Sequence, residues 1–332
     1  MKKCLVGVVI TLVLVFVGCK GGEKSTETYV FKYSNSQSDS HPRSLSMVYF
    51  KGKLEEASGG RITVELYTGG TLGKEAEVLD MVKTGQIQGC RGGLFERVNP
   101  KYLIYTLPFM WDNTDQVLKA MRSDFGQKIN DGARENGFYV PACGVAGGFR
   151  NITSNIKPIK KPADLKGLKM RTPPIDMTLK TFKALGANPQ QVPYVEVYMS
   201  LKTGVVDAQE NPFSNIVDMK FYEAQKYLSV VKWQIHPDPF YVNPQWYDSL
   251  PDDLKEVFDK VSKETMEYSD KIWLESENDF FKVLKDNLEV NELSPAETAE
   301  FAKAVKSVWD GYVKDGFFTQ AEIDEAIKAG KN

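Results

Sequence analysis

The stretch GLKMRTPPIDMTLKTFKALGANPQQVPYVEVYMSLKTGVVDAQENP, residues 167–212, is the most informative part of this chain for predicting its fold. Its first residues alternate apolar and polar side chains, as a half-buried strand does, and Pro173-Pro174 ends that strand just after Arg171. Ligands of open α/β sheets bind beyond the carboxyl ends of the strands. A guanidinium there can give two parallel hydrogen bonds to a carboxylate. We predict that Arg171 anchors a carboxylate, with a surface arginine paired to a neighbouring acid as the alternative.

The residues before this stretch predict a parallel α/β sheet. Residues 29–34 form an expected strand, apolar residues at helical spacing follow up to Gly59-Gly60, and residues 62–66 alternate as a second strand. Helical spacing returns at residues 78–82, and a third strand begins at Ile87. Two successive βαβ units imply a parallel sheet with helices on its faces.

Polar residues occur at the predicted ligand edge of this sheet. The loop from Ser34 to His41 carries hydroxyl, amide and imidazole groups that could bind substrate hydroxyls. A solvated loop in which His41-Pro42 starts the next helix is equally compatible with the sequence. Arg91 follows the third strand, where a second cation would suit a second carboxylate or phosphate, and a salt bridge with Glu96 is the alternative.

The run GVAGGFRN, residues 144–151, concentrates glycines at one strand end, as a hinge or a close backbone approach requires. We expect the first crossover between two domains there. The apolar segment 240–242 should return the chain to the first domain, with Asp238 and Phe240 as candidate cleft residues. His236 has no acid or cysteine at ligand spacing, so we interpret it as structural.

A helical pattern of apolar residues runs from about residue 249 to 287. A continuous helix of this length would reach about 55 Å, longer than one small domain. A break near Tyr268 is the alternative.

The amino terminus has two lysines followed by an apolar run at residues 5–17, too short to span a bilayer, so residues 1–18 are predicted to be a secretory signal. The small residue and cysteine that follow resemble a bacterial lipoprotein signal, which implies lipidation of Cys19 and a tether at residues 19–28; a simply secreted protein is the alternative. We expect Cys90 and Cys143 to be free, buried thiols.

Composition restricts the function. The chain of 332 residues is 42% hydrophobic and 26% charged, values of a globular protein of about two domains. Its formal charge of −2 becomes −4 when residues 1–18 and their two lysines are removed, which argues against nucleic-acid binding. The chain has no GxSxG, HExxH, GxxxxGK[ST] or CxxC motif and only two histidines, so neither an enzyme nor a metal or other cofactor is expected.

The motifs PADLKGLKMRTPP (162–174), LGANPQQVPYVEVYMSL (185–201) and TGVVDAQENP (203–212) resemble those of substrate-binding proteins of tripartite ATP-independent periplasmic (TRAP) transporters, including the branch named for C4-dicarboxylate uptake. The resemblance implies an α/β, two-domain periplasmic binding protein of the Venus flytrap, type II-like class with a long domain-spanning helix. It also implies a monomer that delivers a sugar acid or C4-dicarboxylate to a membrane permease. A carboxylate sensor, or an enzyme acting on a carboxylate, is the alternative function.

The same resemblance implies roles for individual residues. Arg171 would hold the ligand carboxylate, Arg150 in FRNITSN would approach it from the hinge, Asn211 would hydrogen-bond it, and Tyr194 would line the pocket. Glu210 is expected to be structural, as a helix cap or a partner of lysines. The implied domains are 29–147 plus 238–276 and 148–237 plus 277–332. The protein would lie in the periplasm or at the cell surface.

Overall fold

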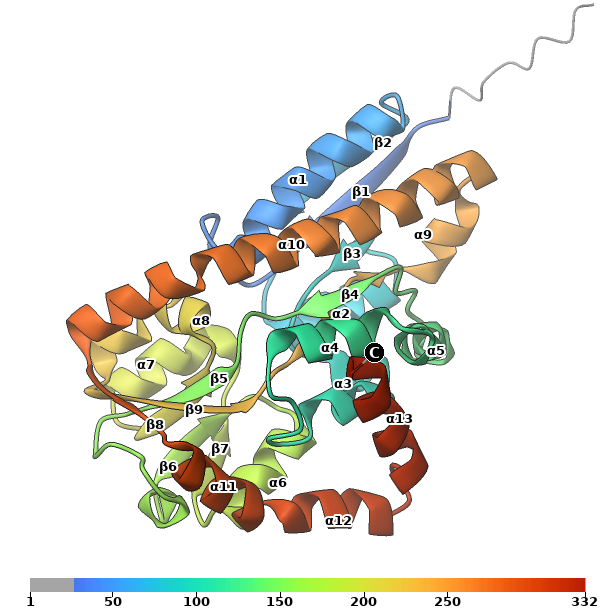
Figure 1. Cartoon of the computed structure of the whole chain (residues 1–332). Coiled ribbons are helices and arrows are strands. Elements are labelled where there is room, and N and C mark those ends of the chain that lie inside the picture. The colour runs from blue at the N-terminus through green and yellow to red at the C-terminus, as the bar shows by residue number, and fades with distance from the viewer. Residues whose placement is uncertain (1–26, 332) are drawn as a thin grey trace, which may run out of the picture.

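Two separate sheets carry the fold, and one long helix passes both of them (Figure 1). The computed structural model describes residues 27–331. Each sheet is covered by helices, so the predicted α/β class is confirmed.

The first sheet has the strand order β11-β3-β1-β2. Strand β1 runs parallel to β2 and β3, and β11 runs antiparallel to β3, which confirms the predicted βαβ units and the return of the chain after the second crossover. Its elements are β1 (Tyr29–Ser34), α1 (Pro42–Ala57), β2 (Ile62–Tyr67), α2 (Glu75–Lys83), β3 (Gly89–Cys90) and β11 (Tyr241–Val242).

The second sheet has the order β12-β9-β5-β8-β6-β7. Strand β6 is parallel to β7 and β8, while β5 is antiparallel to β8 and β9. Its strands are β5 (Arg150–Ser154), β6 (Lys169–Thr172), β7 (Asn188–Gln191), β8 (Ala208–Asn211), β9 (Tyr227–Gln234) and β12 (Glu289–Glu292). Because two prolines follow Thr172, β6 ends there, and Arg171 lies at its carboxyl end as predicted.

Two short strands join the halves. Strand β4 (Cys143–Val145) pairs antiparallel with β10 (Pro237–Pro239), so the two predicted crossovers run beside each other. Gly147 has φ +88°, and a Cβ there would lie 1.8 Å from Cη2 of Trp273. The glycine is therefore required by the close approach of the long helix as well as by its backbone conformation.

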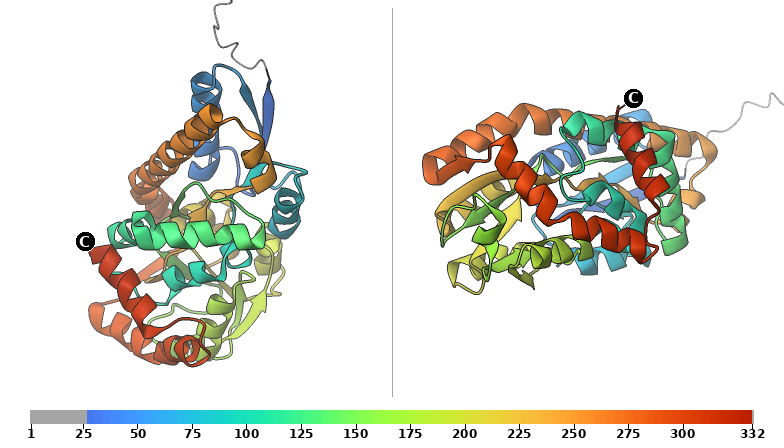
Figure 2. Two further views of the ribbon diagram at one scale, coloured as in Figure 1. Left: turned by 90° about the vertical axis from the view of Figure 1, so that its right-hand side faces the viewer. Right: turned by 60° about the horizontal axis from the view of Figure 1, so that its bottom comes forward.

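The long helix α10 (Asp252–Asn287) has 36 residues without a break at Tyr268, a length of about 54 Å. It runs along α1 and past β4 to α8, and Figure 2 shows it extending over both halves of the molecule. Oδ1 of Asp270 in this helix accepts a hydrogen bond from the backbone N of Val145 at 3.0 Å. The predicted domain boundaries at residues 147, 237 and 276 stay a prediction.

The other helices surround these layers, and the carboxyl-terminal helix α13 lies against α4, an element of the predicted first domain (Figure 1). They are α3 (Phe95–Val98), α4 (Thr114–Arg122), α5 (Asp124–Gly132), α6 (Asp176–Ala184), α7 (Val197–Lys202), α8 (Phe213–Asp218), α9 (Pro244–Ser249), α11 (Pro295–Ala304), α12 (Lys306–Lys314) and α13 (Gln320–Lys331). In the described part of the chain, 3₁₀ turns lie at Pro100–Thr106, Ala133–Asn136, Pro162–Leu165, Tyr194–Glu196 and Phe221–Ala224.

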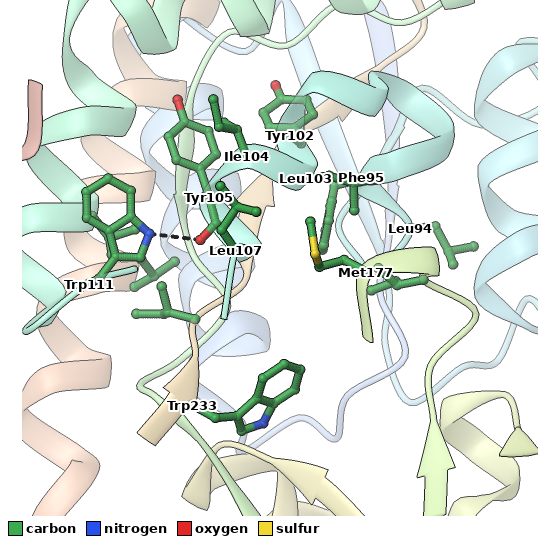
Figure 3. Packing of buried hydrophobic residues seen from close by; sticks show 14 of the residues in the cluster. Leu94, Phe95, Tyr102, Leu103, Ile104, Tyr105, Leu107, Trp111, Met177 and Trp233 are labelled. Atoms are coloured by element: carbon green, nitrogen blue, oxygen red, sulfur yellow. Dashed lines mark hydrogen bonds between the residues drawn. The ribbon is translucent and has the colours of Figure 1, made fainter. Parts of the chain in front are cut away.

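One apolar cluster contains residues of both predicted domains, among them Leu94 and Met177 (Figure 3). Trp111 donates a hydrogen bond from Nε1 to the carbonyl oxygen of Tyr105 at 2.8 Å, so its buried indole nitrogen is satisfied. The apolar core is therefore continuous across the predicted domain boundary.

The two remaining cysteines, Cys90 and Cys143, are buried and unpaired, as predicted. Burial raises the pKa of both thiols, which keeps them protonated and inert. Among residues 27–331, none of the helices combines the length and the apolar character needed to cross a membrane.

Candidate functional site

A cavity of about 120 Å³ lies between the two sheets and is lined from both halves of the chain. Its charged residues are Arg43, Lys74, Glu75, Arg150 and Arg171. Its other polar residues are Gln37, Tyr194, Asn211, Asn215 and His236. An excess of guanidinium groups in an enclosed space favours a negatively charged ligand.

Arg171 is only 2% exposed, and its guanidinium is held by a backbone carbonyl instead of an acid. Its Nε and Nη2 donate to the oxygen of Val192 at 3.0 and 2.8 Å. No carboxylate within residues 27–331 forms an ion pair with it. Burial lowers the pKa of Arg171 to about 10, which Glu210 opposes and Arg150 reinforces, so the side chain is still cationic at neutral pH.

Arg150, in contrast, has its own acid. Its Nη2 lies 2.9 Å from Oε1 of Glu210 and also 2.9 Å from the Glu210 carbonyl, and its Nε donates to Oε2. Glu210 is fully buried on β8, so the expectation of a helix cap or a lysine partner is wrong. The pair lets two arginines share one cavity, because Glu210 forms an ion pair with Arg150 and also acts on the pKa of Arg171 without contacting its guanidinium.

Asn211 and Tyr194 both line the cavity. The Asn211 Oδ1 accepts from Nη2 of Arg150 and from Nδ2 of Asn215, both at 3.1 Å. The Tyr194 hydroxyl is buried without a hydrogen-bond partner among the described residues. Burial raises the pKa of Tyr194 well above its ordinary value, so the hydroxyl keeps its proton and can donate to a ligand.

The sequence analysis missed three charged residues of the first half that line the cavity: Lys74, which is exposed and pairs with Glu196, and Arg43 and Glu75. Arg43 follows the start of α1, where Nη1 donates to Oε1 of Gln37 at 2.7 Å and Nε donates to Oδ2 of Asp238 at 3.1 Å. Glu75 begins α2 and accepts from the backbone N of Gly93 at 3.3 Å. Both stand in the first turn of a helix that follows a strand of the parallel sheet, and this position was the signal available in the sequence.

Burial raises the pKa of Glu75, while the charges of Arg43 and Arg171 oppose this effect. Both cations therefore lower the pKa of the Glu75 carboxyl. Glu75 and Arg171 belong to different halves of the chain, so this interaction crosses the cavity.

Arg91, Ser34 and Phe240 do not line this cavity. Arg91 is 2% exposed and donates from Nε to Oδ2 of Asp238 at 3.1 Å, so its partner is Asp238 and not Glu96. Ser34 is buried, and the hydroxyl has no partner within the described chain. Phe240 is fully buried in an aromatic cluster, with its ring centroid 4.6 Å from that of Tyr33. Its apolar side chain packs in the core beside the first sheet.

The two histidines lie at different distances from the cavity: His236 lines it and His41 does not. His41 starts α1, as one alternative had it, and its ring contacts Asn215 of the second half instead of the cavity. His236 lines the cavity, with Nε2 at 2.7 Å from Oε1 of Gln234. Burial lowers the pKa of His236 well below 6.5, so the ring is neutral there and adds no charge to the arginines.

A buried guanidinium without an acidic partner, in a cavity between two α/β sheets joined by paired strands and a long helix, defines a two-lobed solute-binding protein. The family model of bacterial extracellular solute-binding protein, family 7 (DctP), matches residues 33–315, and the chain belongs to this family. This confirms the resemblance to TRAP substrate-binding proteins and makes the chain a binding protein and not an enzyme.

Named relatives have similar length. The C4-dicarboxylate-binding periplasmic protein DctP of Vibrio cholerae is 29% identical over 296 residues, 86% of this chain and 87% of that protein. The 2,3-diketo-L-gulonate-binding periplasmic protein YiaO of Escherichia coli is 30% identical over 288 residues, again 86% and 87%. The solved structure of the sugar acid binding protein DctPAm of Advenella mimigardefordensis, in complex with galactonate, superposes with a TM-score of 0.87 at 26% identity, covering 92% of this chain and 98% of that one.

Proposed function

We propose that this protein captures a small organic acid, a sugar acid or a C4-dicarboxylate, by a carboxylate clamp at Arg171 and delivers it to the membrane permease of a TRAP transporter. The observation that carries the proposal is the buried Arg171 guanidinium without an acidic partner. A buried cation is costly unless a counter-charge is supplied, and here a ligand carboxylate would supply it.

The donor geometry suits a carboxylate. Val192 occupies the Nε and Nη2 edge of Arg171, which leaves Nη1 and the second Nη2 hydrogen for two parallel bonds to the ligand. The Tyr194 hydroxyl and the unused N–H groups of Asn211 and Asn215 are further donors in the same cavity. Charge-assisted hydrogen bonds of this kind contribute about 1.5–3 kcal/mol each.

The clamp draws on both proposed domains, 29–147 plus 238–276 and 148–237 plus 277–332. Arg43, Gln37 and Glu75 come from the first, and Arg171, Tyr194 and Asn211 from the second. A ligand that contacts both halves favours the closed arrangement, because its affinity for the open one is lower. The closed protein would act as a monomer that the permease recognises.

The family assignment supports a location outside the cytoplasm. We place the protein in the periplasm or at the cell surface, held by a lipid on Cys19 through a tether at residues 19–28. Cys19 and the signal at residues 1–18 lie outside the described residues. A lipid anchor would keep the binding protein beside its permease.

Calorimetry with succinate, D-galactonate and 2,3-diketo-L-gulonate tests the clamp. We expect Arg171→Ala to lower the affinity of the best of these acids by at least about 100-fold, since two charge-assisted bonds are lost. Arg97→Ala, which removes an exposed arginine paired with Asp80, is the control and should bind as wild type. Unchanged affinity in Arg171→Ala, or a wild-type protein whose melting temperature none of the acids raises, would contradict the proposed function.

A further inference from the structure

One side chain links the amino-terminal loop to the cavity wall of the other half. His41 is 2% exposed at the start of α1, and its Nε2 lies 3.0 Å from Oδ1 of Asn215 on α8. Asn215 lines the cavity, whereas His41 does not. The contact therefore joins the two proposed domains through a residue of the cavity wall, Asn215.

The direction of this hydrogen bond follows from the other ring nitrogen. Nδ1 of His41 faces the backbone N–H of Arg43 at 3.1 Å and must accept from it. A neutral imidazole that accepts at Nδ1 carries its proton on Nε2. Burial lowers the pKa of His41 to about 3, which Arg43 reinforces, so the ring is neutral at physiological pH. Nε2 therefore donates to Asn215.

This donation orients a series of amides in the second sheet. Since Oδ1 of Asn215 accepts from His41, its Nδ2 is the group that donates to Oδ1 of Asn211, at 3.1 Å. Nδ2 of Asn211 in turn donates to Oε1 of Gln209 at 2.6 Å, and Nε2 of Gln209 donates to Oγ1 of Thr153 at 2.8 Å. The amide of Asn215 is oriented by His41, and that of Asn211 by Asn215 together with Nη2 of Arg150, so both asparagines have one amide hydrogen left to donate.

The ring of His41 is also held from the hinge side. Its centroid lies 5.3 Å from that of Trp273 on α10 in an edge-to-face contact, and the same indole covers Gly147 between the crossover strands. A second contact between the halves is adjacent, because the hydroxyl and the backbone N of Ser38 both donate to the Asp218 carboxylate. The ring and Asn215 therefore meet only while the two halves are together.

We propose that His41 is a positioning residue for the carboxylate clamp: in the closed protein its Nε2–H fixes the amide of Asn215, which with Arg150 holds Asn211, so that the remaining N–H groups of both asparagines are available to the ligand. This inference rests on the proposed function, because it concerns the same site. It adds a residue that does not touch the ligand and acts through its neighbours, and it explains why the histidine is buried against the other half of the chain.

A double-mutant cycle tests the coupling, with succinate and D-galactonate as probes. His41→Asn is the informative variant, because asparagine is a favoured helix cap but is too short to reach Asn215. We expect His41→Asn and Asn215→Ala each to weaken binding of the better probe about tenfold, and the double variant to be no weaker than the single ones. Ser40→Ala, an exposed neighbour in the same loop, should bind as wild type. Strictly additive losses, or wild-type affinity in His41→Asn, would overturn the inference.

The tautomer of His41 can be measured by NMR, and it distinguishes a positioning role from a purely structural one. In ¹⁵N-labelled protein with the probe bound, the His41 signals should show a protonated Nε2 and an unprotonated Nδ1, and Asn215→Ala should lose the hydrogen-bond shift of the Nε2 proton. A protonated Nδ1 would also overturn the inference. The two proposals fail differently: wild type that binds neither probe contradicts both, whereas wild-type binding that depends on Arg171 but not on His41 contradicts only this one.

Discussion

Arg171 and Arg150 line the same cavity, and the difference between them lies in one neighbouring acid. Glu210 forms an ion pair with Arg150, whereas Arg171 is held by a backbone carbonyl. A neutral acceptor orients a guanidinium without cancelling its charge, so the attraction for an anion is retained at Arg171. Glu75 also modifies the electrostatic field in the cavity, since both Arg43 and Arg171 act on its carboxyl group.

We expect Glu75→Gln to shift selectivity towards ligands with two carboxylates. Glutamine keeps an acceptor for the Gly93 N–H but removes the negative charge near Arg43 and Arg171. The affinity of succinate relative to D-galactonate should rise about tenfold, because a second carboxylate then replaces the one removed. Calorimetry at about pH 8 with both ligands measures the ratio. Asp80→Asn, exposed on the same helix and paired with Arg97, is the control, and an equal ratio in Glu75→Gln and wild type would refute this role for Glu75.

At the scale of elements, α10 and the crossover strands form one unit. Asp270, Trp273 and Glu277 follow each other at helical spacing, and they face Gly144, Gly147 and Gly148 respectively. Any side chain at Gly147 would collide with the Trp273 ring. The glycines at this strand end are therefore needed for the close packing of α10, in addition to any role as a hinge. Asp270 is the buried ionisable member of this contact and also pairs with Arg122 at 2.7 Å.

The contact between α10 and β4 should make stability depend on pH. Burial raises the pKa of Asp270 to about 7, although the Val145 N–H and Arg122 oppose it. Between its unfolded pKa of about 3.9 and that value the folded protein binds more protons than the unfolded chain, so this group lowers stability as pH rises. We expect Asp270→Asn, which retains the acceptor for Val145, to show a flatter dependence of melting temperature between pH 4 and 7.

Thermal unfolding of both proteins at several pH values checks this, with Asp248→Asn as control because Asp248 is exposed beside Arg134. Curves of equal slope for Asp270→Asn and wild type would show that Asp270 does not titrate in this range.

At the scale of the whole molecule, the carboxyl-terminal helices tie the two halves together. The chain leaves the second sheet after β12, continues through α11 and α12, and brings α13 back against α4 (Figure 1). The tail thus bridges regions that the sequence assigned to separate domains. We expect any closure of the two halves to occur at the cavity, which Gln37 of the loop 34–41 and Glu75 of α2 line from the first half.

The proposed membrane attachment concerns the whole protein and is tested at residue 19. We expect Cys19→Ala to move the protein from the membrane fraction to the soluble periplasmic or secreted fraction, because one cysteine would carry the lipid. Fractionation followed by detection of the mature chain measures the change, and Cys90→Ala, which alters a buried thiol, is the control. Retention of Cys19→Ala in the membrane fraction with its signal removed would exclude lipidation.

The sequence by itself determined the fold class, the βαβ order of the first sheet, the long helix and the place of Arg171 at a strand end. These features depend on local patterns: alternation, helical spacing, glycines and prolines. Arg150, Asn211 and Tyr194 were located through the resemblance, and all three line the cavity.

Only the tertiary structure decided which charges are already paired. From the sequence Arg91 was a candidate ligand residue, but in the structure it pairs with Asp238, which is 147 positions away. Glu210 was expected to cap a helix, but it pairs with Arg150. Arg43 and Glu75 reach the cavity because two helix starts converge on one sheet edge. The physical reason is that electrostatic pairing depends on distance in space and on burial, and neither is encoded by the spacing of residues along the chain.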